Sequence, residues 1–247
     1  MKNLKQASKR TIALLAAAAV MLVSGSVLGT RAAINIISEN YDANMNMASN
    51  AVALIENDNP VEEGKLTLGA LGEKDESGKQ VAIIPGKVYT EEIKAQNTTK
   101  APYATPEYVR IIIHKYWKDA EGKNIEFDPA LIKIELANQG SWIKSASETT
   151  AEREVYYYNA VLAAGATTPA LTSGISIDGS ILTKGNETSK TEGNRTVYTY
   201  EYEYNGYSVG IEAEAQSIQT HDAEKAIKSV WGVDATIDGG GNITAIK

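Results

Sequence analysis

The chain has 247 residues, no cysteine and two histidines, and its 24 basic and 31 acidic residues give a net charge of -7 at pH 7. An acidic chain without a stripe of Lys and Arg repels phosphate groups, which argues against nucleic-acid binding. The absence of cysteine excludes thiol catalysis and Cys-ligated zinc. The two histidines, His114 and His221, lie far apart and outside any HExxH pattern, so they leave little material for a zinc site.

The N-terminal segment has the order of a secretory signal. Positions 1–10 carry four basic residues and no acid, positions 12–28 form an apolar run, and small residues recur over 29–33. This order predicts a signal peptide over residues 1–32, helical in its apolar part and removed by a signal peptidase. The mature domain is then 33–247. The alternative is an uncleaved anchor, since the apolar stretch is close to the ~20 residues of a spanning helix. Either way, the membrane is contacted only through this segment.

Short strands separated by turn signals dominate the rest of the sequence, which predicts a β-sandwich or a barrel. The stretch 108–117 has a continuous apolar centre, which is typical of a strand buried on both faces. We therefore expect His114, inside it, to be a buried structural residue. Strands are expected over 65–71, 81–84, 88–95, 108–117, 131–136, 142–143 and 155–162, and from Ile175 onward.

Asn205-Gly206 is the strongest local turn signal, because this dipeptide favours the type I′ turn of a two-residue hairpin. The turn would pair 198–204 with 207–213 and would place four alternate tyrosines of the first strand on one face. Because most of the residues opposite them are apolar, these tyrosines are expected in the core. The alternative is an exposed platform on which sugars stack.

One helix is expected over 221–231, with Thr220 as its N-cap and Gly232 as its end. Apolar residues recur in this segment at helical spacing, and acids occupy its first turn, where the helix dipole favours them. A last hairpin is expected between 234–237 and 242–246. No repeat or long linker divides the sequence, so a single mature domain is expected.

The sequence contains no recognisable catalytic or cofactor motif. It lacks a phosphate-binding glycine loop and a Gly-x-Ser-x-Gly elbow. Alternating glutamates over 201–203 and 212–214 indicate a solvated sheet face rather than an acid–base pair. Asp234, Asp238 and Asn242 are candidate Ca²⁺ ligands, but they lack EF-hand spacing, and Asp-Gly is an ordinary turn signal. We therefore predict no catalytic residue, no cofactor and no metal, and hence a protein that is not an enzyme.

Several short motifs share their order with a known family of exported proteins. The motifs are 29–33 leading into 38–41, Pro85-Gly86 ahead of a strand ending in Asn97, Tyr108-Val109-Arg110 with Trp117 behind it, and 216–221 ahead of a helix ending in Trp231-Gly232. Together they resemble the TasA/camelysin-like proteins of Gram-positive bacteria and their clostridial relatives, over most of the mature chain.

This resemblance implies a jelly-roll-like antiparallel β-sandwich with one short helix in the C-terminal region. It also implies assembly into extracellular biofilm fibres, in which the N-terminal strand of one subunit completes the sheet of the next. The chain departs from the family in lacking a clear processing site directly before this strand. It also carries a tyrosine hairpin that does not map onto the family. Camelysin is described as a metalloprotease, but without an HExxH motif that activity is not carried over. The polymerisation strand implied for this chain is Ala33, Ile34, Asn35, Ile36 and Ile37.

Three functional hypotheses follow. The first is a secreted, non-catalytic cell-surface or matrix subunit whose partners are further copies of itself or related matrix subunits. The second is a surface binding module for a glycan or a protein, which would need an exposed aromatic row from Trp117, Trp142 or the tyrosines. The third, an enzyme, has the least support because no nucleophile–base pattern is present. The solvent exposure of the aromatic rings separates the first two hypotheses.

Overall fold

The computed structural model describes residues 51–61, 66, 68, 76, 82–102, 104–119, 121–122 and 124–247. The expected signal helix, the polymerisation strand over 33–37 and most of the expected strand over 65–71 lie outside these residues. The strands are β1 (Val52–Glu56), β2 (Asn59–Pro60), β3 (Val88–Thr90), β4 (Ile93–Asn97), β5 (Glu107–Lys118), β6 (Asn124–Ile125), β7 (Ile132–Leu136), β8 (Trp142–Lys144), β9 (Arg153–Tyr158), β10 (Thr172–Ile177), β11 (Gly185–Glu192), β12 (Arg195–Tyr202), β13 (Ser208–Gln219), β14 (Ala235–Ile237) and β15 (Ile243–Ile246).

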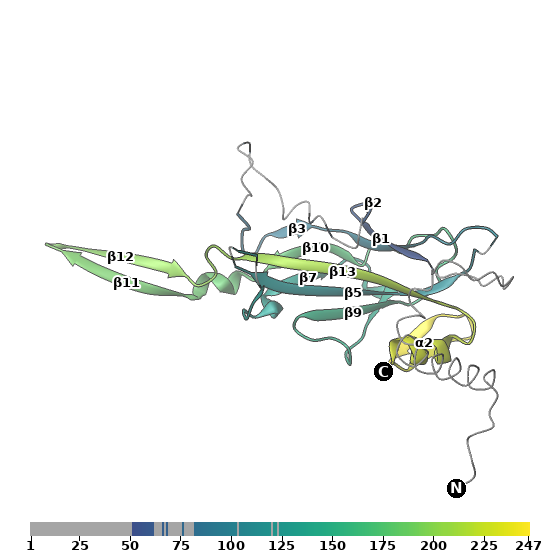
Figure 1. Ribbon diagram of the computed structural model, residues 1–247. Coiled ribbons are helices and arrows are strands. Elements are labelled where there is room, and N and C mark those ends of the chain that lie inside the picture. Colours follow the sequence, from purple (N-terminus) through teal and green to yellow (C-terminus); the bar gives the residue numbers. More distant parts are fainter. Residues whose placement is uncertain are drawn as a thin grey trace, which may run out of the picture.

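Two layers of antiparallel strands pack face to face, so the expected β-sandwich is confirmed (Figure 1). One layer has the order β13-β5-β9-β8, with β6 on the end of β5. The other layer consists of the sheets β2-β1-β4 and β3-β10-β7. The segment before β10 links these two sheets, because the Thr168 and Leu171 amides donate to the Ala95 and Ile93 carbonyls, each over 2.8 Å.

The expected strand over 108–117 is confirmed as β5, and it is buried on both faces. Ile111 and Ile113 point into the core between the two layers. Tyr108 and Ile112 point the other way, into a second core that the helix α2 (Ala223–Trp231) and the β14–β15 hairpin close. A continuous apolar run is therefore needed at this strand. The prediction that His114 is buried is wrong, because its side chain is exposed.

The helix and the final hairpin form nearly as predicted. α2 ends at Gly232, whose left-handed φ of 76° suits glycine and whose amide donates to the Lys228 carbonyl over 3.1 Å. The predicted N-cap is wrong, since Asp222 rather than Thr220 precedes the first turn, and the Asp222 side chain makes no capping bond. Elsewhere, the predicted strand over 88–95 divides into β3 and β4, and the described residues 82–84 of the strand predicted over 81–84 are not in a strand.

The hairpin predicted at Asn205-Gly206 is wrong. β13 pairs with β5 over its whole length, whereas β12 pairs with β11, a strand that we did not predict. Asn205-Gly206 lies in the connection between the two sheets, where Gly206 has a φ of 86°. The β11–β12 pair is a two-stranded ribbon that extends away from the sandwich (Figure 1).

Candidate functional site: an exposed tyrosine face on a projecting ribbon

The tyrosines that we assigned to the core lie mainly on the surface of the ribbon. Tyr198, Tyr200 and Tyr202 are 67%, 41% and 45% exposed, and only Tyr204, beyond the end of β12, is buried. The prediction fails because Val209, Ile211 and Ala213 pair with β5 and leave the tyrosines opposite β11. Alternate residues of a strand share a face, so the three exposed rings form one row.

The backbone of β11 holds the central ring of this row in place. Gly185 pairs with Tyr202, and a Cβ atom added to it would lie 2.7 Å from Cε1 of Tyr200, so only glycine leaves room for that ring. The Tyr200 hydroxyl donates to the Thr183 carbonyl over 3.2 Å. The ring centroids of Tyr200 and Tyr202 are 4.8 Å apart. At least two of the three rings are thus positioned before any partner arrives.

An aromatic cluster at the base attaches the ribbon to the sandwich. The ring of the buried Tyr204 lies 4.9 Å from that of Trp117 and 4.4 Å from that of Phe127. Tyr207 meets Phe127 edge-on at 4.8 Å. The Trp117 indole donates to the Asp128 carbonyl over 3.0 Å, which fixes the largest ring of the cluster.

A cleft of about 560 Å³ opens beside this cluster. Its walls are mainly apolar and come from the ribbon base, from β13 and from the short 3-10 helix Gly179–Thr183. Tyr202 belongs both to the cleft and to the exposed row, so the two surfaces are continuous. The principal lining residues are Ile83, Trp117, Ile181, Leu182, Tyr204 and Val209.

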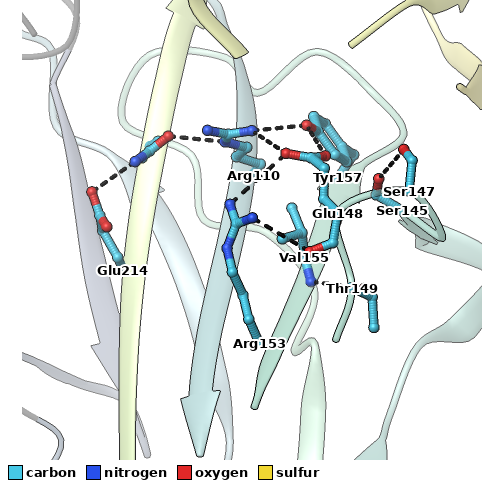
Figure 2. Close-up of polar contacts among 10 residues, drawn as sticks. Arg110, Ser145, Ser147, Glu148, Thr149, Arg153, Val155, Tyr157 and Glu214 are labelled. Atoms are coloured by element: carbon cyan, nitrogen blue, oxygen red, sulfur yellow. Dashed lines mark hydrogen bonds and ion pairs between the residues drawn. The ribbon is translucent and has the colours of Figure 1, made fainter. Parts of the chain in front are cut away.

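A buried polar network lies on the opposite side of the β13-β5-β9-β8 layer from the main core (Figure 2). The Arg110 guanidinium donates to Gln216 over 2.9 Å, to Glu148 over 3.0 Å and to the Tyr157 hydroxyl over 2.9 Å. Burial raises the pKa of Tyr157, and Glu148 adds to this effect while Arg110 opposes it. The Trp231 ring of α2 covers the guanidinium, with its centroid 4.9 Å from Cζ. The network joins the helix to the sheet and leaves no room for a substrate.

A second buried ion cluster is centred on Glu154. Burial alone would raise the pKa of this carboxyl, but hydrogen bonds from Lys115, Lys144 and Tyr156 lower it to about 2. Lys115 also donates to the Ile132 carbonyl over 2.7 Å and so ties β5 to β7 across the core. A carboxylate held ionised in this way is a poor general acid.

Glu91 and Glu56 form a third buried group, at the end of the β1 strand. Glu91 is 1% exposed, and the side-chain amide of Asn57 donates to Oε2 of Glu91 over 3.2 Å. Burial, together with the hydrogen bond and charge of Glu56, raises the pKa of Glu91 to about 8. The carboxyl therefore keeps its proton at neutral pH. A substrate could not reach so enclosed a group.

The candidate Ca²⁺ ligands of the sequence do not converge. The Asp238 carboxylate accepts hydrogen bonds from the backbone amides of Gly240 and Asn242, each over 2.8 Å, which is the arrangement of an ordinary turn. The hydrogen bonds from Asn242 lower the pKa of Asp238. Asp234 pairs with Lys228 over 2.7 Å instead. Within the described parts of the chain, no group of three or more His, Asp or Glu side chains is arranged to hold a metal ion.

Of the other residues named from the sequence, the tryptophans do not form an exposed row, whereas the glutamates of β13 lie where we expected them. Trp117 and Trp142 are buried, so they contribute nothing to an exposed aromatic row. Glu212 and Glu214 are exposed on β13, which confirms the solvated sheet face expected there. The sequence of β11, GNETSKTE, has no apolar residue, so no hydrophobic pattern predicts the ribbon.

Comparison with protein-family models, curated proteins and solved structures gives no match. None of the helices in the described part of the chain has the length and apolar character of a membrane span.

Proposed function

We propose that the protein is an exported, non-catalytic structural subunit of the cell surface or extracellular matrix, which assembles with further copies by addition of its N-terminal strand. The N-terminal order of basic and apolar residues supports export. The buried ion clusters of Arg110 and Glu154 support a rigid, non-catalytic body, because both are taken up by internal contacts.

The observation that carries the assembly part of this proposal is the edge of β13. This strand is 12 residues long and ends its layer, so its pairing in the described structure is with β5 alone. A long edge strand is a template for another strand. Beside it runs a groove of about 600 Å³, lined by apolar side chains of β1 and β13 such as Val52, Leu54 and Ala213, and by the polar His114, Glu212 and Glu214. The apolar segment 33–37 of a neighbouring copy has the composition to fill such a groove.

The test compares the mature chain beginning near Thr30, called the full chain below, with a variant that lacks residues 30–40 and so begins at Tyr41. Size-exclusion chromatography and negative-stain microscopy report assembly. At protein concentrations too low for weaker contacts, filaments from the full chain and monomers from the variant are expected. Monomers from both proteins under all conditions would remove the basis of the proposal, and filaments from both would remove the N-terminal strand from the mechanism.

A binding module is the second candidate, and the exposed tyrosine row favours it. Tyrosine rings on a solvent-facing sheet can stack on the apolar faces of sugars or pack against a protein ligand. A glycan array probed with the wild type and with Tyr198→Ser tests this candidate. Selective binding that the substitution abolishes would support it, because Tyr198 is the most exposed ring of the row.

A further inference from the structure

The two faces of the ribbon differ in their chemistry. Because alternate residues share a face, one side carries the exposed tyrosines with Glu187, Ser189 and Thr191 (the tyrosine face). The other side carries Arg195, Val197, Thr188, Thr199 and Lys190 (the arginine face), with Glu201 at its base and Glu192 opposite Arg195 in the register. Val197 is 42% exposed, so both faces present apolar surface to solvent.

The rings of the tyrosine face have no cation over them in the described structure, unlike five other described tyrosines. Elsewhere in the described chain, lysine or arginine lies over an aromatic ring at several places, such as Lys87 over Tyr89 at 4.6 Å and Lys184 over Tyr204 at 5.7 Å. Among the described residues, no such contact involves Tyr198, Tyr200 or Tyr202. A ring face attracts a cation electrostatically. These rings are therefore suited to a cation from outside the ribbon's own face.

The charged groups of the two faces are complementary. Glu187, opposite Tyr200 in the register, is the single charged residue of the tyrosine face. Within the described structure, neither Glu187 nor Arg195 takes part in an ion pair. Glu187 therefore makes the aromatic surface on one side of the ribbon electronegative, and the Arg195 guanidinium on the other side forms no ion pair with a described side chain.

From this complementarity we propose that the occupant of the tyrosine face is a second copy of the chain, which packs the arginine face of its own ribbon against it. The second copy's arginine lies over the tyrosine rings and beside Glu187. The contact joins two different surfaces, so it repeats from copy to copy and builds an open chain rather than a closed dimer. This inference rests on the self-assembly proposed above and adds a second contact to it.

The test uses two double variants, each of which removes one face. The tyrosine-face variant is Glu187→Lys with Tyr198→Ser, and the arginine-face variant is Arg195→Glu with Val197→Ser. All four residues are exposed, and Val88→Ser, which changes another exposed valine outside the ribbon, is the matched control. Circular dichroism and hydrogen exchange of the ribbon amides verify that each variant stays folded.

All variants are placed in both the full chain and the form lacking residues 30–40, and sedimentation velocity is followed at rising concentration. The unsubstituted ribbon is expected to associate in both backgrounds, more weakly at high salt. In the form lacking residues 30–40, each double variant alone should associate at least about tenfold more weakly, while Val88→Ser should not. In that form an equimolar mixture of the two double variants keeps one intact contact and should form dimers but nothing larger.

Three results would overturn the inference. The arginine-face variant could still dimerise alone, which would show that two tyrosine faces meet. The mixture could stay monomeric, or the unsubstituted ribbon could fail to associate and bind a glycan or foreign protein instead. Because strand addition is absent in the form lacking residues 30–40, failure of the ribbon contact is distinguishable from failure of the N-terminal strand.

Discussion

The carboxyl of Glu91 is protonated in the folded protein at neutral pH. Its pKa is raised to about 8, from 4.5 in a solvated chain, first by burial and then by Glu56. A raised folded pKa gives stability that is fully present below pH 4.5 and is lost as the pH rises through about 8. We expect the free energy of unfolding to fall by a few kcal/mol over this window, as urea denaturation at a series of pH values would measure.

The matched variants for this prediction are Glu91→Gln and Glu201→Gln. Glutamine keeps the shape of a protonated carboxyl but cannot ionise, so Glu91→Gln should remove most of the pH dependence between pH 4.5 and 8. Glu201 is exposed on the ribbon, and its substitution should leave the slope unchanged. Equal slopes in the two variants would contradict a titrating Glu91.

Arg110 is a second residue whose removal has a predictable cost. Arg110→Met would leave the carboxylate of Glu148 with the longer contact to Arg153, at 3.8 Å, and would uncover one face of Trp231. Breaking one side of a buried ion pair costs about 3–5 kcal/mol. We expect a loss of that size in urea denaturation, with a smaller loss in Arg110→Met combined with Glu148→Gln. A double variant as unstable as the single one would show that packing, not charge, accounts for the loss.

At the scale of single elements, Tyr204 anchors the ribbon through its contacts with Trp117 and Phe127. Tyr204→Ala removes a buried ring from this cluster and should lower the free energy of unfolding by about 3 kcal/mol. Tyr198→Ala removes an exposed ring from the same segment and should change it by less than about 0.5 kcal/mol. Thermal and urea denaturation of the two variants provide the comparison. Similar losses would mean that the ribbon tyrosines form part of the core after all.

The same elements show what sequence patterns can and cannot predict here. β7 and α2 were predictable because their apolar residues recur at the spacing of the structure they form, and β5 because its apolar run is continuous. The partner of β12 was not predictable, because Asn-Gly marks a turn but does not say whether the flanking strands pair. β11 has no apolar residue, so no burial pattern revealed it. The tyrosine row was visible in the sequence, but its exposure depended on that partner.

The whole molecule combines a rigid sandwich with a ribbon that adds little to its core. The main core lies between the layers and the second one beneath α2, and the buried members of both come from outside β11 and β12. The exposed aromatic surface therefore lies on the ribbon, whereas the polar networks of Arg110 and Glu154 are enclosed in the sandwich.

This division predicts that the ribbon can be removed. Its ends are close together, since the Glu203 amide donates to the Lys184 carbonyl over 3.1 Å, and Gly185 pairs with Tyr202. Replacing residues 186–201 with Asn-Gly should therefore close a short hairpin without strain. We expect a folded sandwich whose melting temperature lies close to that of the wild type and whose self-association through the ribbon is lost. An unfolded product would show instead that the sandwich depends on the ribbon, and calorimetry with sedimentation separates the two outcomes.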